Sequence, residues 1–148
     1  MLRVYDFYAN ACVRVVSNNT TLPNEVEVEI ERIWNEEQSR RGKALFNGEI
    51  LSAMEVSAQE ILGCRAEYKH LVAQRIQPTL FEVLGVRPVA VSGVLECSDG
   101  LVLGRRAATT TQDAGLWELV PSGGLDPSNV TENAELDYLL QILAELYE

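Results

Sequence analysis

The chain has 148 residues, of which 47% are hydrophobic and 23% charged, and this composition suits one ordinary globular core or two small subdomains. Its formal net charge of −10 argues against binding to a nucleic acid duplex, because contacts with the phosphate backbone require clustered Lys and Arg. Three widely spaced cysteines and one histidine exclude the usual ligand set of a structural zinc site and the usual residues of a histidine-dependent triad.

The amino-terminal residues and the cysteines both bear on the cellular compartment. Arg3 and Asp6 interrupt the apolar residues where a secretory signal would have a continuous apolar core. The odd number of cysteines, without a C-x-x-C pair, favours a reducing environment. The sequence has no run of about 18 apolar residues that would span a bilayer. We therefore expect a cytoplasmic protein with no membrane partner.

Residues 1–85 are expected to form an amino-terminal α/β region. The aromatic and β-branched residues of 2–16 predict one or two strands. A helix is expected between Pro23 and Gly42. Its apolar face would consist of Ile30, Ile33 and Trp34, and its solvent face would include Glu31, Glu36, Glu37 and Arg40. Residues 25–30 also alternate between Glu and apolar side chains as a strand would, so the first turns of this helix remain open.

The second part of this region is expected to contain both strands and helices. Residues 43–66 hold short apolar groups, which predict two or three antiparallel strands with a tight turn at Asn47-Gly48. The apolar spacing of residues 66–75 predicts a short helix that ends before the proline that follows. A further helical turn is expected at 79–84. His70 is interpreted as a surface or partly packed helix residue and not as a catalytic one.

Strand and turn patterns follow one another beyond residue 85. Residues 86–95 are typical of a buried strand, and Ser98-Asp99-Gly100 predicts a hairpin turn into a second strand at 101–106. After a polar loop, a strand with Trp117 leads to Gly123-Gly124, which is expected to form a turn. Trp117 is interpreted as a core anchor, with base stacking as the alternative.

The last residues predict an apolar helix, from Glu135 onward, with a single polar stripe. The stripe consists of Asp137, Gln141, Glu145 and Glu148, at spacings of four, four and three. Two carboxylates on neighbouring turns can chelate a hard cation such as Mg²⁺, which prefers oxygen ligands. The alternative is the solvated face of an amphipathic helix. Because no glycine, asparagine or proline ends this helix, we expect the chain to be truncated within it.

Two segments resemble the signature of the Nudix pyrophosphohydrolases, G-x5-E-x7-R-E-U-x-E-E-x-G-U, in which U is a bulky aliphatic residue. Segment 115–124, GLWELVPSGG, is similar to the Trp-bearing strand and Pro-Gly-Gly found in that family, and segment 144–148, AELYE, is similar to R-E-U-x-E. Ser122 is inserted before the glycines, Ala144 stands in place of the arginine, and the intervening stretch is about six residues longer than in the signature. The isolated glutamate of the signature has two candidates, Glu132 and Glu135.

The resemblance implies an α+β fold, an α/β/α Nudix-like sandwich with a mixed sheet, present here as an incomplete domain over 86–148. It implies a Nudix-type pyrophosphohydrolase, which cleaves a nucleoside diphosphate linked to another group through attack by a metal-activated water. Glu145 and Glu148 would be catalytic, and with the carbonyl of Gly124 they would hold Mg²⁺ or Mn²⁺. Gly123, Gly124 and Arg105 would bind the phosphates. We expect this chain to be inactive by itself, because the signature is incomplete.

The expected partner is therefore a small-molecule nucleoside diphosphate derivative. The segments Leu45-Phe46-Asn47-Gly48 and Leu84-Gly85-Val86 resemble Nudix enzymes that act on UDP-sugars. Two other interpretations remain open. Ala144 and the longer stretch before it are also compatible with a non-catalytic Nudix-like module that binds a nucleotide or a partner. The apolar side chains of the closing helix are compatible with an assembly surface, which would give a homodimer.

Overall fold

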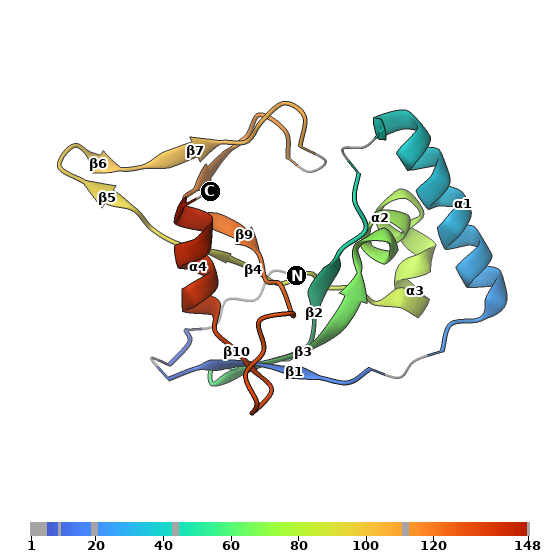
Figure 1. The fold of residues 1–148 in the computed structure, drawn as a ribbon, viewed down its shortest axis with the longest axis horizontal. Coiled ribbons are helices and arrows are strands. Elements are labelled where there is room, and N and C mark those ends of the chain that lie inside the picture. The colour runs from blue at the N-terminus through green and yellow to red at the C-terminus, as the bar shows by residue number, and fades with distance from the viewer. Residues whose placement is uncertain (1–5, 9, 19–20, 43–44, 111–112, 148) are drawn as a thin grey trace. The chain divides into compact units, whose positions relative to one another are not determined.

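The computed structural model describes residues 6–8, 10–18, 21–42, 45–110 and 113–147. They form a mixed α+β structure that includes a mixed sheet, which confirms the expected fold class at this level (Figure 1). The chain separates into a larger unit, Met1–Val89 with Asp126–Leu136, and a smaller unit, Ala90–Leu125 with Asp137–Glu148. The domain boundary expected from the sequence, between residues 85 and 86, stays a prediction.

The larger unit contains a four-stranded sheet in the order β10-β1-β3-β2. Its strands are β1 (Cys12–Val16), β2 (Glu49–Val56), β3 (Glu60–Glu67) and β10 (Glu135–Leu136). β1 runs parallel to β3, whereas β2 is antiparallel to β3 and β10 is antiparallel to β1. The side chains of Val13, Leu51 and Leu136 are buried on this sheet. In the described part of the chain, residues 2–16 therefore contribute one strand.

The turn between β2 and β3 lies at residues 57–59, and the prediction of a tight turn at Asn47-Gly48 was wrong. The Ser57 hydroxyl accepts hydrogen bonds from the amides of Gln59 (3.3 Å) and Glu60 (3.1 Å), which closes the hairpin. Asn47 precedes β2 and has another task, because its side chain bridges the Glu67 carboxylate (2.8 Å) and the amide of Lys69 (2.9 Å). Asn47 thus satisfies a backbone donor at the start of the next helix.

The helices of the larger unit pack against one another. They are α1 (Asn24–Arg41), α2 (Tyr68–Ile76), the 3₁₀ turn η2 (Pro78–Leu80) and α3 (Phe81–Leu84). α1 lies between Pro23 and Gly42 as predicted, and the alternating residues at its start are helical. Ile30 and Ile33 join Ala73 and Leu80 in one buried cluster, whereas Val28 is 62% exposed, as a helical period requires.

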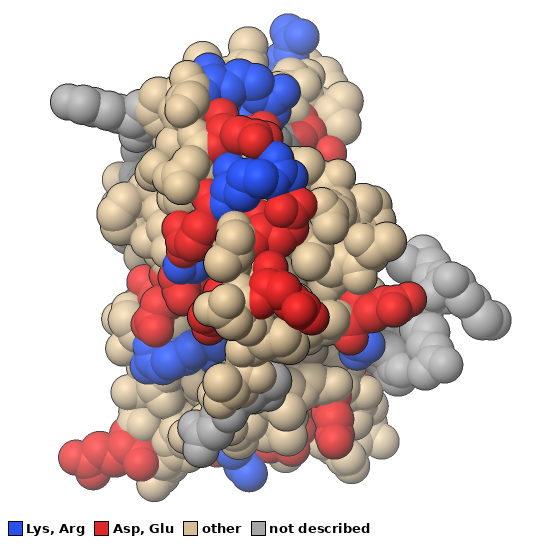
Figure 2. Space-filling view, turned by 90° about the vertical axis from the view of Figure 1, so that its right-hand side faces the viewer, with Lys and Arg blue, Asp and Glu red and all other residues tan. Residues whose placement is uncertain are grey.

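The outer face of α1 carries a band of paired charges (Figure 2). Arg32 bonds Glu29 (2.8 Å) and Glu36 (2.6 Å), one turn away on either side. Glu37 was expected to face water, but its side chain is only 12% exposed and pairs with Arg40 (2.7 Å) and Arg41 (3.0 Å). The hydrogen bond from Arg40 keeps the pKa of Glu37 below its ordinary value. The three arginines of α1 are thus paired within the helix, which keeps an excess of glutamates.

Buried polar contacts fix the segment that leaves the larger unit. The Gln74 amide group bonds both backbone groups of Val86, donating to its carbonyl (2.6 Å) and accepting from its N–H (3.1 Å). The hydroxyl of Ser52 accepts from the N–H of Arg87 (3.0 Å). Because Gln74 and Val86 are buried, these bonds satisfy groups that water cannot reach.

The smaller unit consists of three antiparallel strand pairs and one helix. The strand pairs are β4 (Ala90–Ser92) with β9 (Ser122–Gly124), β5 (Glu96–Cys97) with β6 (Gly100–Leu101), and β7 (Leu103–Arg105) with β8 (Trp117–Leu119). The predicted hairpin turn at Ser98-Asp99-Gly100 is confirmed, and Gly100 has the positive φ of 127° that it needs there. The strand expected over 86–95 is shorter and is limited to β4.

The closing helix α4 (Tyr138–Tyr147) begins later than predicted. Glu135 and Leu136 pair with β1 as β10, so they belong to the sheet of the larger unit. The carboxylate of Asp137 then accepts the N–H of Leu140 (2.8 Å), an N-cap bond that starts the helix. Among the described helices, none has the length and the apolar run that crossing a bilayer requires.

Candidate functional site

The diglycine segment, Gly123 and Gly124, forms a strand and not the predicted turn. As part of β9 it pairs with β4, in the register Val91 to Gly123 and Ala90 to Gly124. The carbonyl of Pro121 accepts the N–H of Gly93 (2.7 Å), which extends the pairing beyond β4. The segment is therefore extended, and neither glycine is needed for a left-handed backbone conformation. The absence of side chains instead allows other groups to approach the backbone closely.

The carboxylate of Glu145 occupies the space directly above Gly123. A Cβ atom placed on Gly123 would overlap Oε1 and Cδ of Glu145 and would lie 2.7 Å from Oε2. A Cβ atom on Gly124 would have no atom within 4 Å. A side chain would therefore fit at position 124 but would collide with Glu145 at position 123. Only glycine at position 123 leaves room for this carboxylate.

Gln141 lies one turn before Glu145 on the same stripe of α4. Its side-chain amide donates to the carbonyl of Gly124 (2.6 Å). The spacing of four residues in the sequence predicted that Gln141 and Glu145 share a face, and the structure brings both to the diglycine segment. The sequence did not indicate that Gln141 would bond Gly124. Asp137, the first residue of the stripe, caps the helix instead, and Glu148 lies outside the described residues.

Arg105, predicted to bind phosphate, lies exposed on β7. Its Nε donates to the carbonyl of Gly115 (3.0 Å), which holds the side chain at the loop before β8. The neighbouring Arg106 pairs with Glu118 (2.6 Å). Trp117, in register with Arg105, is 67% exposed, so its interpretation as a core anchor was wrong. An arginine and an indole thus lie opposite each other on a single ribbon.

The two candidates for the isolated glutamate of the signature lie between the diglycine segment and α4, in the stretch that is longer here than in the signature. Glu135 is in β10, and its carboxylate is 3.9 Å from a guanidinium nitrogen of Arg14 on β1. Glu132 is exposed in the loop before β10. The extra residues between the diglycine segment and α4 therefore supply an edge strand to the sheet of the larger unit.

Few ligands for a metal ion come together in the described part of the chain. The carboxylate of Glu145 and the carbonyl of Gly124 are oxygen donors of the kind that Mg²⁺ and Mn²⁺ accept, and the bare backbone at Gly123 makes room for the first of them. Within the described residues, no group of three or more His, Cys, Asp or Glu is placed to hold an ion. The Glu145 carboxylate and the Gly124 carbonyl would thus supply only part of the coordination shell of such an ion.

Most apolar side chains of α4 are exposed. Ile142 packs towards β4, since its Cγ2 would lie 3.6 Å from a Cβ atom on Gly93. The exposed apolar residues of the helix are Leu139, Leu140, Leu143, Leu146 and Tyr147. None of the described residues of α4 is fully buried.

Comparison with known proteins adds no assignment. Neither a protein-family model nor a curated protein matches this chain.

Proposed function

We propose that the chain carries part of the site of a Nudix-type pyrophosphohydrolase, which cleaves a nucleoside diphosphate linked to another group. The carboxylate of Glu145 against the bare backbone of Gly123 is the observation that supports this most directly. The resemblance in sequence assigns metal-binding glutamates and glycines to the same positions. Glu145 and Glu148 would be ligands of Mg²⁺ or Mn²⁺, together with the Gly124 carbonyl.

The charge around the diglycine segment supports a cation-dependent reaction. Residues 137–148 contain three acidic residues and no Lys or Arg. A diphosphate would be repelled by this stripe unless a divalent cation neutralised it. When bound, the cation would screen the phosphate charge and lower the pKa of an attacking water. No protein nucleophile is required for such a displacement.

The residues of the chain have separate tasks in this proposal. Gly123 admits the carboxylate of Glu145, and the strand pairing of β9 holds the backbone that faces it. Gln141 donates to the Gly124 carbonyl, whose second lone pair would bind the cation. Arg105 would contact phosphate through the guanidinium nitrogens that do not donate to Gly115.

Turnover is tested with Mg²⁺ or Mn²⁺ and a panel of UDP-sugars, ADP-ribose and dinucleoside polyphosphates. The assay compares this chain with a longer one, in which residues added after Glu148 complete the signature. Release of nucleoside monophosphate is expected from the longer chain, and it should fall by about 100-fold in Glu145→Gln and Glu148→Gln. Glu135→Gln is the matched control, because Glu135 lies in β10 beside Arg14. Undiminished turnover in Glu145→Gln would remove that residue from the mechanism.

A non-catalytic module that binds a nucleotide or a partner is the second candidate. It is favoured by the bond from Gln141, which already satisfies the carbonyl assigned to the metal, and by Ala144 in place of the arginine. Calorimetry of the chain with nucleoside diphosphates, with and without Mg²⁺, separates the two functions. Binding that ignores Mg²⁺, together with no turnover in the longer chain, supports the module. Binding only with Mg²⁺ supports the hydrolase.

A further inference from the structure

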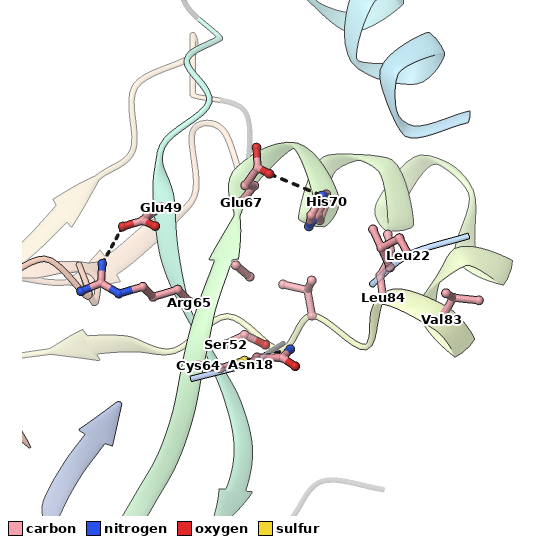
Figure 3. A pocket seen from close by; sticks show the side chains of 12 residues that line it. Asn18, Leu22, Glu49, Ser52, Cys64, Arg65, Glu67, His70, Val83 and Leu84 are labelled. Atoms are coloured by element: carbon pink, nitrogen blue, oxygen red, sulfur yellow. Dashed lines mark hydrogen bonds and ion pairs between the residues drawn. The ribbon is translucent and has the colours of Figure 1, made fainter. Parts of the chain in front are cut away.

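The larger unit has a hollow of about 250 Å³ where two parallel strands end (Figure 3). Asn18 follows β1, Cys64 lies near the end of β3, and His70 is in the first turns of α2. β1 and β3 are adjacent and parallel, and each is followed by a helix. Ligands of open α/β sheets characteristically bind in the crevice outside the carboxyl ends of such strands.

The polar groups of this hollow can each donate and accept a hydrogen bond. Ser52 is 4% exposed, and its hydroxyl accepts from the N–H of Arg87 (3.0 Å) while its own hydrogen can be donated. The amide of Asn18 donates to the sulfur of Cys64 (3.6 Å), and its oxygen is an acceptor. These groups lie together beside β3 in Figure 3.

His70 adds a further uncharged group. Burial lowers the pKa of His70, and the opposing attraction of Glu67, whose Oε1 is 3.9 Å from Nε2, is the smaller effect. The imidazole is therefore neutral near pH 7, with one donor and one acceptor nitrogen. His70 also lines an adjoining hollow of about 460 Å³, together with Leu22 and Glu67. The two hollows thus meet at this ring.

Aliphatic side chains form another wall of the hollow. They are Leu22, Val83, Leu84 and Val86. Arg65 and Glu49 also border the hollow, but they pair with each other (2.6 Å) on the far side of β3 (Figure 3). Glu67 also lines the hollow and pairs with Lys69 (3.2 Å), so a charged ligand would meet only charges that already have a partner. A ligand without an apolar face would place polar groups against the aliphatic wall.

We infer that this hollow binds a small, uncharged, flat heterocycle with adjacent hydrogen-bond donors and acceptors, of the kind found in pyrimidine bases. Its polar edge would face Asn18, Ser52 and His70, and its ring would lie against Leu84 and Val86. Polyols fit less well because hydroxyl groups on every side would meet the aliphatic wall. The hollow lies within the larger unit, so the inference does not depend on the proposed pyrophosphohydrolase.

The test is an NMR titration of the chain with free uracil, in the absence of metal ions. The side-chain amide of Asn18 and the ring of His70, the one histidine of the sequence, are the reporters. Both signals should shift and saturate with uracil, and binding should weaken by about tenfold in Asn18→Ala. Val83→Trp should weaken it equally by filling the hollow, and because Val83 is 45% exposed this variant removes no core contact.

Glu55→Gln, at an exposed position of β2, is the control and should bind uracil like the unchanged chain. Glucose and inorganic phosphate are the competing probes. Saturable shifts with either of them and none with uracil would overturn the assignment of the ligand class. Unchanged uracil binding in Val83→Trp would overturn the assignment of the site.

Discussion

Replacement of Gly123 by alanine tests the contact between the diglycine segment and α4. The new Cβ would overlap the carboxylate of Glu145, whereas the same change at Gly124 meets open space. Both glycines are in β9, so both substitutions change the strand backbone in the same way. Gly124→Ala is therefore the matched control for the loss of backbone freedom.

The size of the effect follows from two opposing contributions. Alanine in place of glycine inside a strand stabilises by about 0.5–1 kcal/mol. Overlap with a neighbour costs about 1–3 kcal/mol, and because the flexible end of Glu145 can move, the lower part of this range applies. Gly123→Ala should thus destabilise the smaller unit by up to about 1 kcal/mol. In a Glu145→Ala background the overlap is gone, and the same change should stabilise by about 0.5–1 kcal/mol.

The assay is amide hydrogen exchange at Gly93, whose N–H donates to the carbonyl of Pro121 (2.7 Å) and so reports opening of the β4–β9 pair. A double-mutant cycle over Gly123 and Glu145 should give a coupling free energy of about 1–2 kcal/mol, and one over Gly124 and Glu145 a coupling near zero. If Gly123→Ala and Gly124→Ala stabilise equally in both backgrounds, Glu145 does not lie above Gly123.

Three further predictions concern groups outside this contact. Gln74→Leu should destabilise the larger unit by about 2–4 kcal/mol, because both backbone groups of Val86 lose their buried partner, and urea denaturation that shows a cost under about 1 kcal/mol would contradict this. In the folded state, burial lowers the pKa of His70 below its ordinary value of 6.5. The contribution of neutral His70 to the free energy of unfolding should therefore be fully present above pH 6.5 and be lost as the pH falls through the folded-state pKa. The NMR signal of the ring should titrate below pH 6.5, and His70→Gln should flatten this part of the stability profile, whereas a higher midpoint would refute the assignment. Asp137→Ala should lower the stability of α4 by about 1 kcal/mol, measured by hydrogen exchange in the helix, and Asp137→Asn should retain most of it because asparagine also caps; equal losses in the two variants would argue against the cap.

The sequence predicted the features that depend on neighbouring residues. Pro23 and Gly42 marked the ends of α1, and Ser98-Asp99-Gly100 marked a hairpin, because helix ends and tight turns are set by local backbone preferences. The polar stripe of α4 followed from a spacing of four residues, which places Gln141 and Glu145 on one face. Each of these needed fewer than about 20 residues of context.

Features set by distant pairing could not be predicted in this way. Glu135 and Leu136 continue the apolar pattern of α4, yet they pair with β1, more than a hundred residues earlier in the chain. The diglycine segment has the composition of a turn, but pairing with β4 keeps it extended. The hollow beside Ser52 and His70 depends on four separate segments that meet only in the folded unit. Periodicity carries no information about such partners.

The central claim is that the carboxylate of Glu145 and the backbone of the diglycine segment hold a divalent cation. Substoichiometric Mn²⁺ added to ¹⁵N-labelled chain should broaden the amide signals of Gly123, Gly124 and Glu145 before any others, and Glu145→Gln should abolish this selectivity. Broadening that is strongest along the acidic face of α1, or that persists unchanged at the diglycine segment in Glu145→Gln, would contradict the account.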